Sequence, residues 1–353
     1  MSASSFDDVV GAALIRAHHL IDIHRPDEAL RMLAAALAED PDNPDILCAA
    51  ARASLDSSRY REAGEFATRA AAAAPHWELP FRVLAAALFC MGDPEKAASC
   101  ARKAVALAPN EWLTHYVRAL VCSTSRLSSQ EAYAAARRAI HLAPNEADAW
   151  AVLGHVAVEN RDQDIAQKAL EKALSLEPTH STARNDLGRL HLLRDDPVGA
   201  AGHFAGAVAS DVRCREAVQN LESTVSEAFS DIIIVFGIVL ALIEWTVIAV
   251  GAHPSASTRL VVGVFCLRIV GSLLIKQLMP LLRAPPGRYV FSLLRLYPEL
   301  IAAAALQFTG FALLTAVWAL PGRAWLWLTA IGTAALFGSV LLHVRHVRRR
   351  LST

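Results

Sequence analysis

The stretch WAVLGHVAVENRDQDIAQKALEKALSLEP (residues 150–178) decides how the first half of this chain folds. Trp150 and Leu153 are spaced so that both side chains lie on one face of a helix. Gly154 and Ala166 are small, which allows two antiparallel helices to approach each other. The final proline ends the second helix, because it has no N–H and disfavours a helical residue before it. The stretch therefore predicts a helical hairpin.

This hairpin recurs along the chain with a regular period. Prolines follow one another at intervals of 34, 34, 35 and 34 residues: Pro41, Pro75, Pro109, Pro144 and Pro178. Twelve residues before each proline stands an alanine: Ala29, Ala63, Ala97, Ala132 and Ala166. One such hairpin cannot bury its apolar face alone, so we expect the repeats to stack into a solenoid.

The period and the spacing of Trp150, Leu153 and Gly154 resemble the tetratricopeptide repeat family. In this repeat only Ala157 departs from the family pattern, which has an aromatic residue there. The resemblance covers roughly residues 8–212. It implies an all-α fold, with a solenoid of about six repeats within residues 1–212. The fourth repeat carries one extra residue, which we place in the turn at 123–129, and Val212 stands where the sixth proline would be.

A further helix is expected after the sixth repeat. Apolar residues with helical spacing form a stripe on an otherwise polar segment: Cys214, Val218, Leu221 and Val225. We interpret residues 213–231 as a capping and linker helix that shields the last repeat from water.

The two halves of the chain carry opposite charge. Residues 231–353 contain eleven Lys and Arg against three Asp and Glu, which leaves 23 against 31 for the first 230 residues. The opposed charge and the apolar composition of the second half indicate two environments. Arginine outnumbers lysine 29 to 5, which suggests a GC-rich bacterial genome.

Residues 232–344 are expected to form a transmembrane domain of four helices. Each apolar stretch is long enough to cross a hydrocarbon core of ~30 Å, and the four are 232–251, 260–282, 300–320 and 324–344. Arginines gather in the connection between the second and third stretches and in the basic tail, residues 345–353. This bias, and the lack of a secretory signal at the N-terminus, predict a multi-pass protein of the bacterial inner membrane with both termini cytoplasmic.

Two charged residues are expected at similar depth within the first two spans. Glu244 and Arg268 each lie several residues from the outer end of their helix, so we predict an intramembrane ion pair between them. Such a pair either staples two helices together or forms part of an ion path, and we favour the staple. The arginines of residues 288–298 are expected to contact membrane lipids from a short interfacial helix.

The resemblance also implies a peptide-binding groove. In tetratricopeptide domains, fixed positions of each first helix face the concave side. Carried onto this chain, those positions hold Arg52, Arg82, Tyr116, His155, Asn185 and Arg189. The set partly resembles the carboxylate-clamp domains that bind acidic peptide C-termini, although the clamp lysine is missing. The partner would then be a protein or peptide, with an acidic or C-terminal peptide as one hypothesis. Simple solvation of these side chains is the other.

The sequence contains no recognisable motif for catalysis or for binding a cofactor or metal. It contains no nucleotide-binding or dinucleotide-binding glycine loop, no H-E-x-x-H zinc motif and no G-x-S-x-G nucleophile motif. The histidines and the six cysteines are dispersed, without ligand spacing. The basic tail fits a membrane surface better than nucleic acid. We therefore expect no enzyme activity, cofactor, metal or nucleic-acid partner.

Two functions remain open. The first is a membrane-tethered adaptor or scaffold, whose repeats recruit a partner to the cytoplasmic face. The alternative is a small channel, a transporter subunit or another membrane-complex component that the repeats regulate. The dearth of polar residues in the spans favours the first, and the presence of four spans instead of one favours the second.

Overall fold

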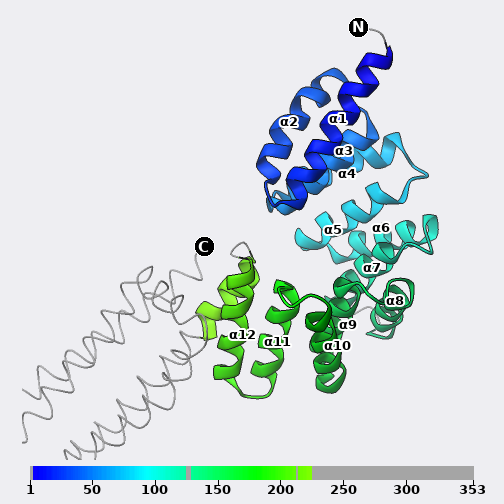
Figure 1. The fold of residues 1–353 in the computed structure, drawn as a ribbon. Coiled ribbons are helices and arrows are strands. Elements are labelled where there is room, and N and C mark those ends of the chain that lie inside the picture. Colours follow the sequence, from blue (N-terminus) through cyan, green and yellow to red (C-terminus); the bar gives the residue numbers. More distant parts are fainter. Residues whose placement is uncertain (1–2, 125–128, 212–213, 225–353) are drawn as a thin grey trace, which may run out of the picture. The chain divides into compact units, whose positions relative to one another are not determined.

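The computed structural model describes residues 3–124, 129–211 and 214–224. This part of the chain contains twelve labelled α-helices (Figure 1). Their bounds are α1 (Ala3–Asp22), α2 (Pro26–Glu39), α3 (Pro44–Asp56), α4 (Tyr60–Ala73), α5 (Glu78–Cys90), α6 (Pro94–Leu107), α7 (Trp112–Thr124), α8 (Ser129–Leu142), α9 (Ala147–Glu159), α10 (Gln163–Leu176), α11 (Ser181–Leu193) and α12 (Pro197–Ser210). The chain divides after Leu190 into two units.

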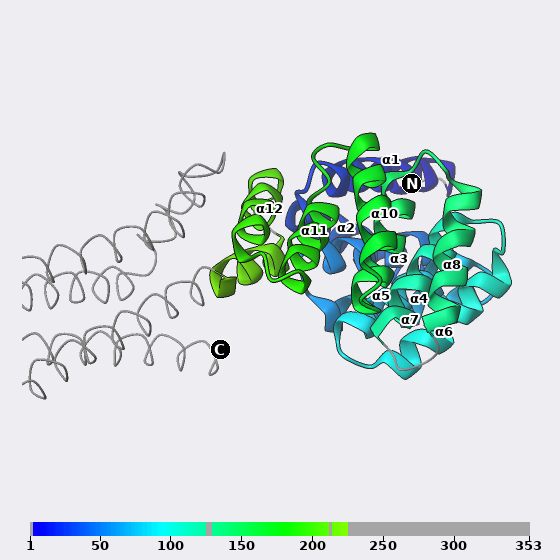
Figure 2. The same ribbon diagram turned by 90° about the horizontal axis from the view of Figure 1, so that it is seen from below.

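In the first unit, consecutive helices form hairpins that follow one another in chain order (Figure 1). Each odd-numbered helix from α1 to α9 packs against the even-numbered helix after it. The odd-numbered helices also pack against each other in succession, α1 on α3, α3 on α5, α5 on α7 and α7 on α9. The odd-numbered helices therefore form one continuous layer. In the view of Figure 2, α6 and α8 lie at the periphery of this unit.

Small residues allow the helices of each hairpin to approach closely. All five of the periodic alanines are fully buried: Ala29, Ala63, Ala97, Ala132 and Ala166. A sixth, Ala200 of α12, continues the series in the second unit and is also fully buried. The prediction that this position lies between packed helices is confirmed, and the described residues form the expected all-helical repeat array.

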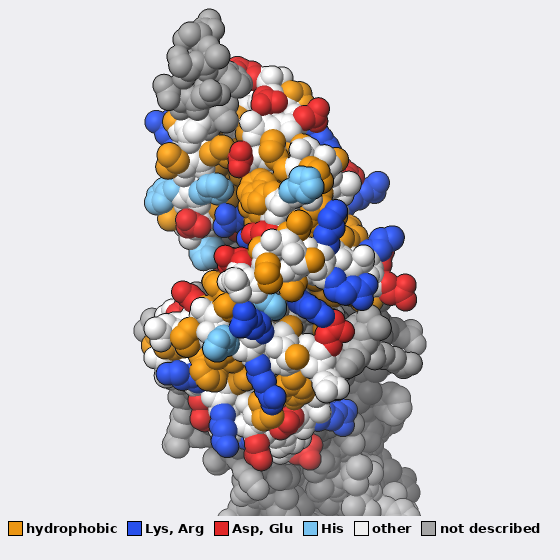
Figure 3. All heavy atoms as spheres, turned by 90° about the vertical axis from the view of Figure 1, so that its right-hand side faces the viewer, with side chains coloured by type: hydrophobic (Ala, Val, Ile, Leu, Met, Phe, Trp, Pro, Cys, Tyr) orange, Lys and Arg blue, Asp and Glu red, His pale blue; other side chains and the backbone are white. Residues whose placement is uncertain are grey.

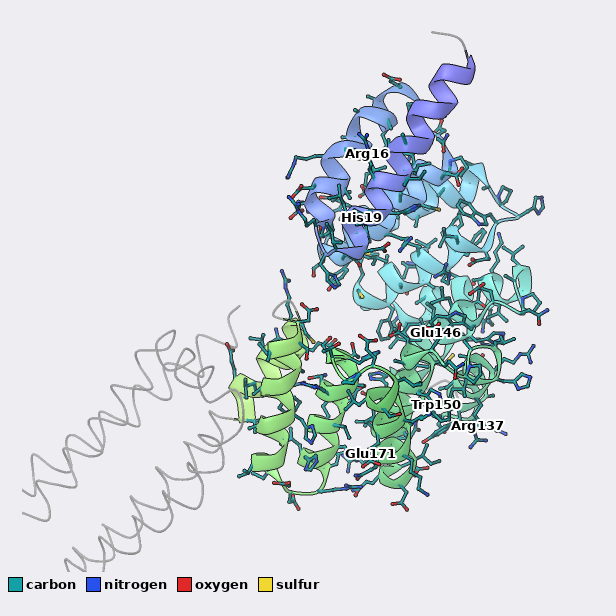
Figure 4. The ribbon with its side chains drawn as sticks, viewed as in Figure 1. Arg16, His19, Arg137, Glu146, Trp150 and Glu171 are labelled. Carbon is teal, nitrogen blue, oxygen red and sulfur yellow. The ribbon has the colours of Figure 1, made fainter. Side chains whose placement is uncertain are left out.

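The periodic prolines lie in the turns that connect one hairpin to the next. Helix α2 ends at Glu39, two residues before Pro41, and α10 ends at Leu176, two residues before Pro178. In three of these turns a side chain six residues later donates a hydrogen bond to the proline carbonyl. The donors are Trp150 Nε1 to Pro144 at 2.9 Å, His115 Nε2 to Pro109 at 2.9 Å, and Arg184 to Pro178 at 2.5 Å. Figure 4 labels Trp150 on α9. These bonds satisfy carbonyls that the proline turns leave outside the helices.

Wherever the structure describes the turn inside a hairpin, that turn contains a residue with left-handed backbone. The five described cases are His24, Ser58, Gly92, Arg161 and Asp195, with φ between 55° and 80°. In each turn the next residue donates its N–H to the carbonyl five residues before it, as Arg59 does to Ser54 at 2.8 Å. This geometry closes the first helix with a Schellman-type cap. The α7–α8 connection spans four residues where the others span three, which is where the sequence places the extra residue.

In the second unit, α12 packs against the segment that follows it. Residues 215–224 are helical. Leu221 is fully buried in one cluster with Phe204, and Cys214 and Val218 pack against that cluster. The apolar stripe of the expected capping helix therefore covers α12 as far as the structure describes it.

Several expectations fall on residues that the structure does not describe. These are the four predicted spans within residues 232–344, the Glu244–Arg268 pair and the basic tail at 345–353. Among the helices that are described, none combines the length and the apolar character that crossing a membrane requires.

Candidate functional site

The residues predicted to line a groove all lie on odd-numbered helices. Arg52 is on α3, Arg82 on α5, Tyr116 on α7, His155 on α9, and Asn185 and Arg189 on α11. Five of them are half-buried, whereas Asn185 is only 1% exposed. The buried position of Asn185 makes it part of the packing of α11, and as a ligand contact it stays a prediction. Charged and histidine side chains are interspersed with hydrophobic ones on the face drawn in Figure 3.

The structure joins two of these residues in one network between α9 and α11. His155 Nδ1 lies 3.0 Å from Asp186 Oδ2. Arg189 donates to Asp186 Oδ1 at 3.1 Å and to Glu159 Oε1 at 2.5 Å. The side chain of Asp186 is only 2% exposed, so this carboxylate is buried between a histidine and an arginine. Helices α9 and α11 are thus linked by opposite charges.

Burial and charge act against each other on His155. Desolvation lowers the pKa of its imidazole. The charge and hydrogen bond of Asp186 raise the pKa by a larger amount, so it lies above its ordinary value. In the reverse direction, His155 and then Arg189 outweigh the desolvation of Asp186 and hold the pKa of that carboxyl below its ordinary value. Both directions favour the ion pair. His155 Nε2 is buried and has no hydrogen-bond partner among the described residues.

A second histidine connects the same two helices by a different arrangement. His180, just before α11, has its Nε2 3.0 Å from Asp148 Oδ1 of α9. Its Nδ1 accepts the N–H of Ala183 at 3.2 Å, so it caps the first turn of α11. Only the neutral ring can accept that bond. The capping contact therefore favours the neutral form, in opposition to the Asp148 carboxylate.

Arg82 lies in a separate charged group on α3 and α5. It forms an ion pair with Glu78 at 3.1 Å, and both side chains are less than a fifth exposed. Burial, reinforced by the negative charges of Asp45 and Glu78, raises the pKa of the nearby Cys48 thiol to about 12, and Arg82 and Arg52 oppose that rise. The two arginines that the sequence places in different repeats thus act on one buried thiol.

Arg52 differs from the other two predicted arginines. Among the described residues it has no ion pair, whereas Arg82 and Arg189 are both engaged by carboxylates. Burial and the positive charge of Arg52 lower the pKa of His18 on α1. Tyr116 instead packs edge-on against Trp112, with ring centroids 6.1 Å apart. Arg52 is therefore the one predicted arginine whose charge the described array leaves available.

The partners of His155 and Arg189 were not found from the sequence as a network. His155 and Asp186 are 31 residues apart, and His180 and Asp148 are 32 apart. These separations match no contact within one helix and arise only when neighbouring repeats stack. The repeat period of about 34 residues was the sequence feature that could have predicted these contacts. It brings residues slightly less than one period apart onto facing helices.

Within residues 3–124, 129–211 and 214–224, no group of three or more His, Cys, Asp or Glu side chains could hold a metal ion. The arrangement on α9 and α11 consists of opposite charges that satisfy one another. These charges hold α11, as far as Leu190, against α9 and present polar atoms on the odd-numbered helices.

Comparison with known proteins identifies the repeats. The Tetratricopeptide repeat family matches at residues 20–87 and again at residues 151–211. No curated protein matches the chain.

Among solved structures, the chain is similar to the Cut9–Hcn1 hetero-tetramer of the APC/C, with 20% identity and a TM-score of 0.50. The match covers 60% of this chain and 42% of that one, so this chain spans less than half its length. Two others are PilF of Pseudomonas aeruginosa (16% identity, 61% and 97% covered, TM-score 0.44) and a thermophilic TPR protein of Thermus thermophilus (22%, 61% and 98%, 0.36). The first of these likenesses supports the helical repeat fold. The chain therefore contains tetratricopeptide repeats, and its described helices form a tetratricopeptide repeat array.

Proposed function

We propose that this chain is a membrane-tethered adaptor whose repeats recruit a protein partner to the cytoplasmic face of a bacterial inner membrane. One observation carries the proposal: the odd-numbered helices form a continuous layer that carries half-buried charged side chains. Repeat arrays bind other polypeptides along such an extended surface, and tetratricopeptide repeat domains bind proteins or peptides.

The charge pattern of this layer narrows the partner. Arg82 and Arg189 already pair with carboxylates of the array, so their charge is largely compensated. Arg52 is half-buried and has no ion pair among the described residues. An arginine in that state gains most from a carboxylate supplied by a ligand. The partner that fits best presents an acidic group to α3.

The tether is inferred from composition. Residues 231–353 carry four apolar stretches long enough to span a membrane. They contain eleven basic residues and three acidic ones. Arginines at the ends of these stretches fit the positive-inside pattern. With the array at the same face as the tail, the partner would be concentrated at the membrane without any added contact.

The test compares the full chain with a chain that ends at Ser230, each crosslinked in cells and captured from membrane and soluble fractions. We expect both to recover the same partner, and only the full chain to resist extraction from membranes. Arg52→Ala should reduce the recovery of that partner. Arg31→Ala, an exposed arginine of α2 without an ion pair in the described chain, is the matched control. Equal recovery by Arg52→Ala and Arg31→Ala would remove the acidic-group assignment.

The alternative, a membrane channel, transporter subunit or other membrane-complex component, is favoured by one feature: a tether needs one span and the sequence offers four. In that case the truncated chain would recover nothing, and the full chain would recover integral membrane proteins. Replacing Glu244 and Arg268 together by leucines should leave an adaptor working and should abolish transport.

A further inference from the structure

A continuous network of four charged side chains connects α9 to α11. Glu159 of α9 accepts from Arg189 of α11, Arg189 donates to Asp186, and Asp186 faces His155 of α9 at 3.0 Å. Two of the four side chains come from each helix. All four lie in the first unit, before the chain divides after Leu190.

We propose that this contact is a pH-responsive joint, in which protonation of His155 tightens α11 against α9 and deprotonation loosens it. The geometry supports the proposal because, of the four side chains in this network, His155 is the one whose charge changes near neutral pH. Asp186 and Arg189 keep their charges there, so one switchable contact stands beside a permanent ion pair.

The charges that act on His155 come from both helices. Asp186 and Arg189 face it from α11, and Glu159 lies on its own helix α9. The two carboxylates favour the imidazolium, and the guanidinium of Arg189 opposes it. Arg189 is itself held by both carboxylates, which leaves Asp186 as the dominant neighbour of His155.

The sign of the effect follows from the raised pKa of His155. A histidine with a higher pKa in the folded state than in the unfolded state stabilises the fold below the unfolded value. That contribution is lost as the pH rises through the folded pKa. Above it, Nδ1–H still donates to the Asp186 carboxylate, but the attraction between the imidazolium and that carboxylate is lost. The joint is therefore tight at mildly acidic pH and looser at alkaline pH.

Burial lowers the pKa of the neighbouring His180, but the hydrogen bond and charge of Asp148 outweigh it, so this pKa is also raised. Its Nδ1 accepts the Ala183 amide, and protonation would break that cap while strengthening the contact to Asp148. The two effects oppose each other, so His180 provides an internal contrast to His155. Asp148 is also 54% exposed, and solvent screens its charge.

A joint at this place can change the array because each repeat contacts only its neighbours. Loosening this contact changes how α11, as far as Leu190, packs on α9 without unfolding either helix. The joint itself goes beyond the proposed function. Only its effect on partner binding, through His155 and Arg189, rests on that function.

The first measurement is hydrogen exchange at the imidazole C2 position of the full chain, which reports the pKa of each histidine by mass spectrometry. His155 should titrate above the ordinary histidine value of 6.5. A midpoint for His155 at or below that ordinary value would overturn the proposal, and this result needs no variant.

The second measurement is amide exchange of residues 147–159 and 181–190 in the full chain, corrected for intrinsic rates. Between about pH 5.5 and about pH 8.5 the wild type should exchange about three- to tenfold faster at the higher pH. His155→Gln should lose that dependence, and His76→Gln should keep it. Exchange that is independent of pH in the wild type, or equally dependent in His155→Gln, would contradict the joint.

Discussion

Gly154 of α9 and Leu170 of α10 approach so closely that a Cβ on the glycine would stand 2.5 Å from both Cγ and Cδ2 of the leucine. Leu170 is fully buried, so its side chain cannot swing away without displacing neighbours. The two helices of the fifth hairpin are held at a separation that only glycine allows. The same glycine in the sequence predicted this approach.

We expect Gly154→Ala to destabilise the array by about 1–3 kcal/mol, because overpacking a filled core costs more than alanine gains in helix propensity. Urea denaturation followed by circular dichroism measures the change. The control is Gly202→Ala in α12, where an added Cβ meets nothing within 4 Å. That variant should be stabilised by about 0.5–1 kcal/mol. If both substitutions stabilise, the close approach is wrong.

The hairpin turns provide a second test, at one structural position in several repeats. Ser58 and Arg161 hold left-handed backbone with φ of 58° and 59°, where Gly92 has 80°. A non-glycine residue there destabilises the folded state by about 1–2 kcal/mol. Replacing it by glycine removes that strain, but glycine also raises the entropy of the unfolded chain, which offsets part of the gain. We expect Ser58→Gly and Arg161→Gly to stabilise by about 0.5 kcal/mol and Gly92→Ala to destabilise by about 1 kcal/mol. Thermal melting of the three variants decides it, and a stabilising Gly92→Ala would refute the turn geometry.

The sequence predicted the fold better than the site, for a physical reason. Ala166, Gly154 and Pro178 are required by close packing and helix termination within one hairpin, so their spacing can be read along the chain. The ion pairs of Arg82 and Arg189 depend on side chains that stacking brings together. A position pattern identifies the helix face but not which charges on it neutralise each other. For the same reason, Asn185 was placed on the face although it is 1% exposed.

The proline turns give a third prediction. Trp150→Phe keeps an aromatic ring but removes the Nε1–H donor to the Pro144 carbonyl, so we expect a loss of about 0.5–1.5 kcal/mol. Chemical denaturation should show it as a lower midpoint with an unchanged slope. Trp112→Phe is the matched control, because the Trp112 Nε1 has no hydrogen bond among the described residues. Equal losses in the two variants would mean that the capping bond contributes nothing.

Asp186 should be the most sensitive charged residue of the array. Asp186→Asn removes a 2% exposed carboxylate and leaves His155 and Arg189 without their shared partner, so we expect a loss of about 3 kcal/mol. Asp164→Asn, at an exposed position in the first turn of α10, should cost less than about 0.5 kcal/mol.

The pH dependence of that loss follows from two shifts. The lowered pKa of Asp186 contributes stability above its ordinary value of 3.8, which is lost as the pH falls through the folded pKa. The raised pKa of His155 contributes below 6.5 and is lost as the pH rises. The difference between wild type and Asp186→Asn should therefore be largest between about pH 4 and about pH 6.5. A difference that grows steadily toward alkaline pH would contradict the pair.

Thiol reactivity tests the packing around α3. With its pKa raised to about 12 by burial and by the carboxylates of Asp45 and Glu78, Cys48 carries almost no thiolate at neutral pH. Alkylation requires the thiolate and access to it, and Cys90 at the end of α5 is exposed. We expect iodoacetamide at about pH 8 to label Cys90 at least tenfold faster than Cys48. Peptide mass spectrometry of the full chain separates the two sites.

In denaturant the rates should converge, because burial and the fixed carboxylates are both lost. Comparable labelling in the folded chain would show that Cys48 is accessible, and that the α3–α5 packing opens on the timescale of the reaction.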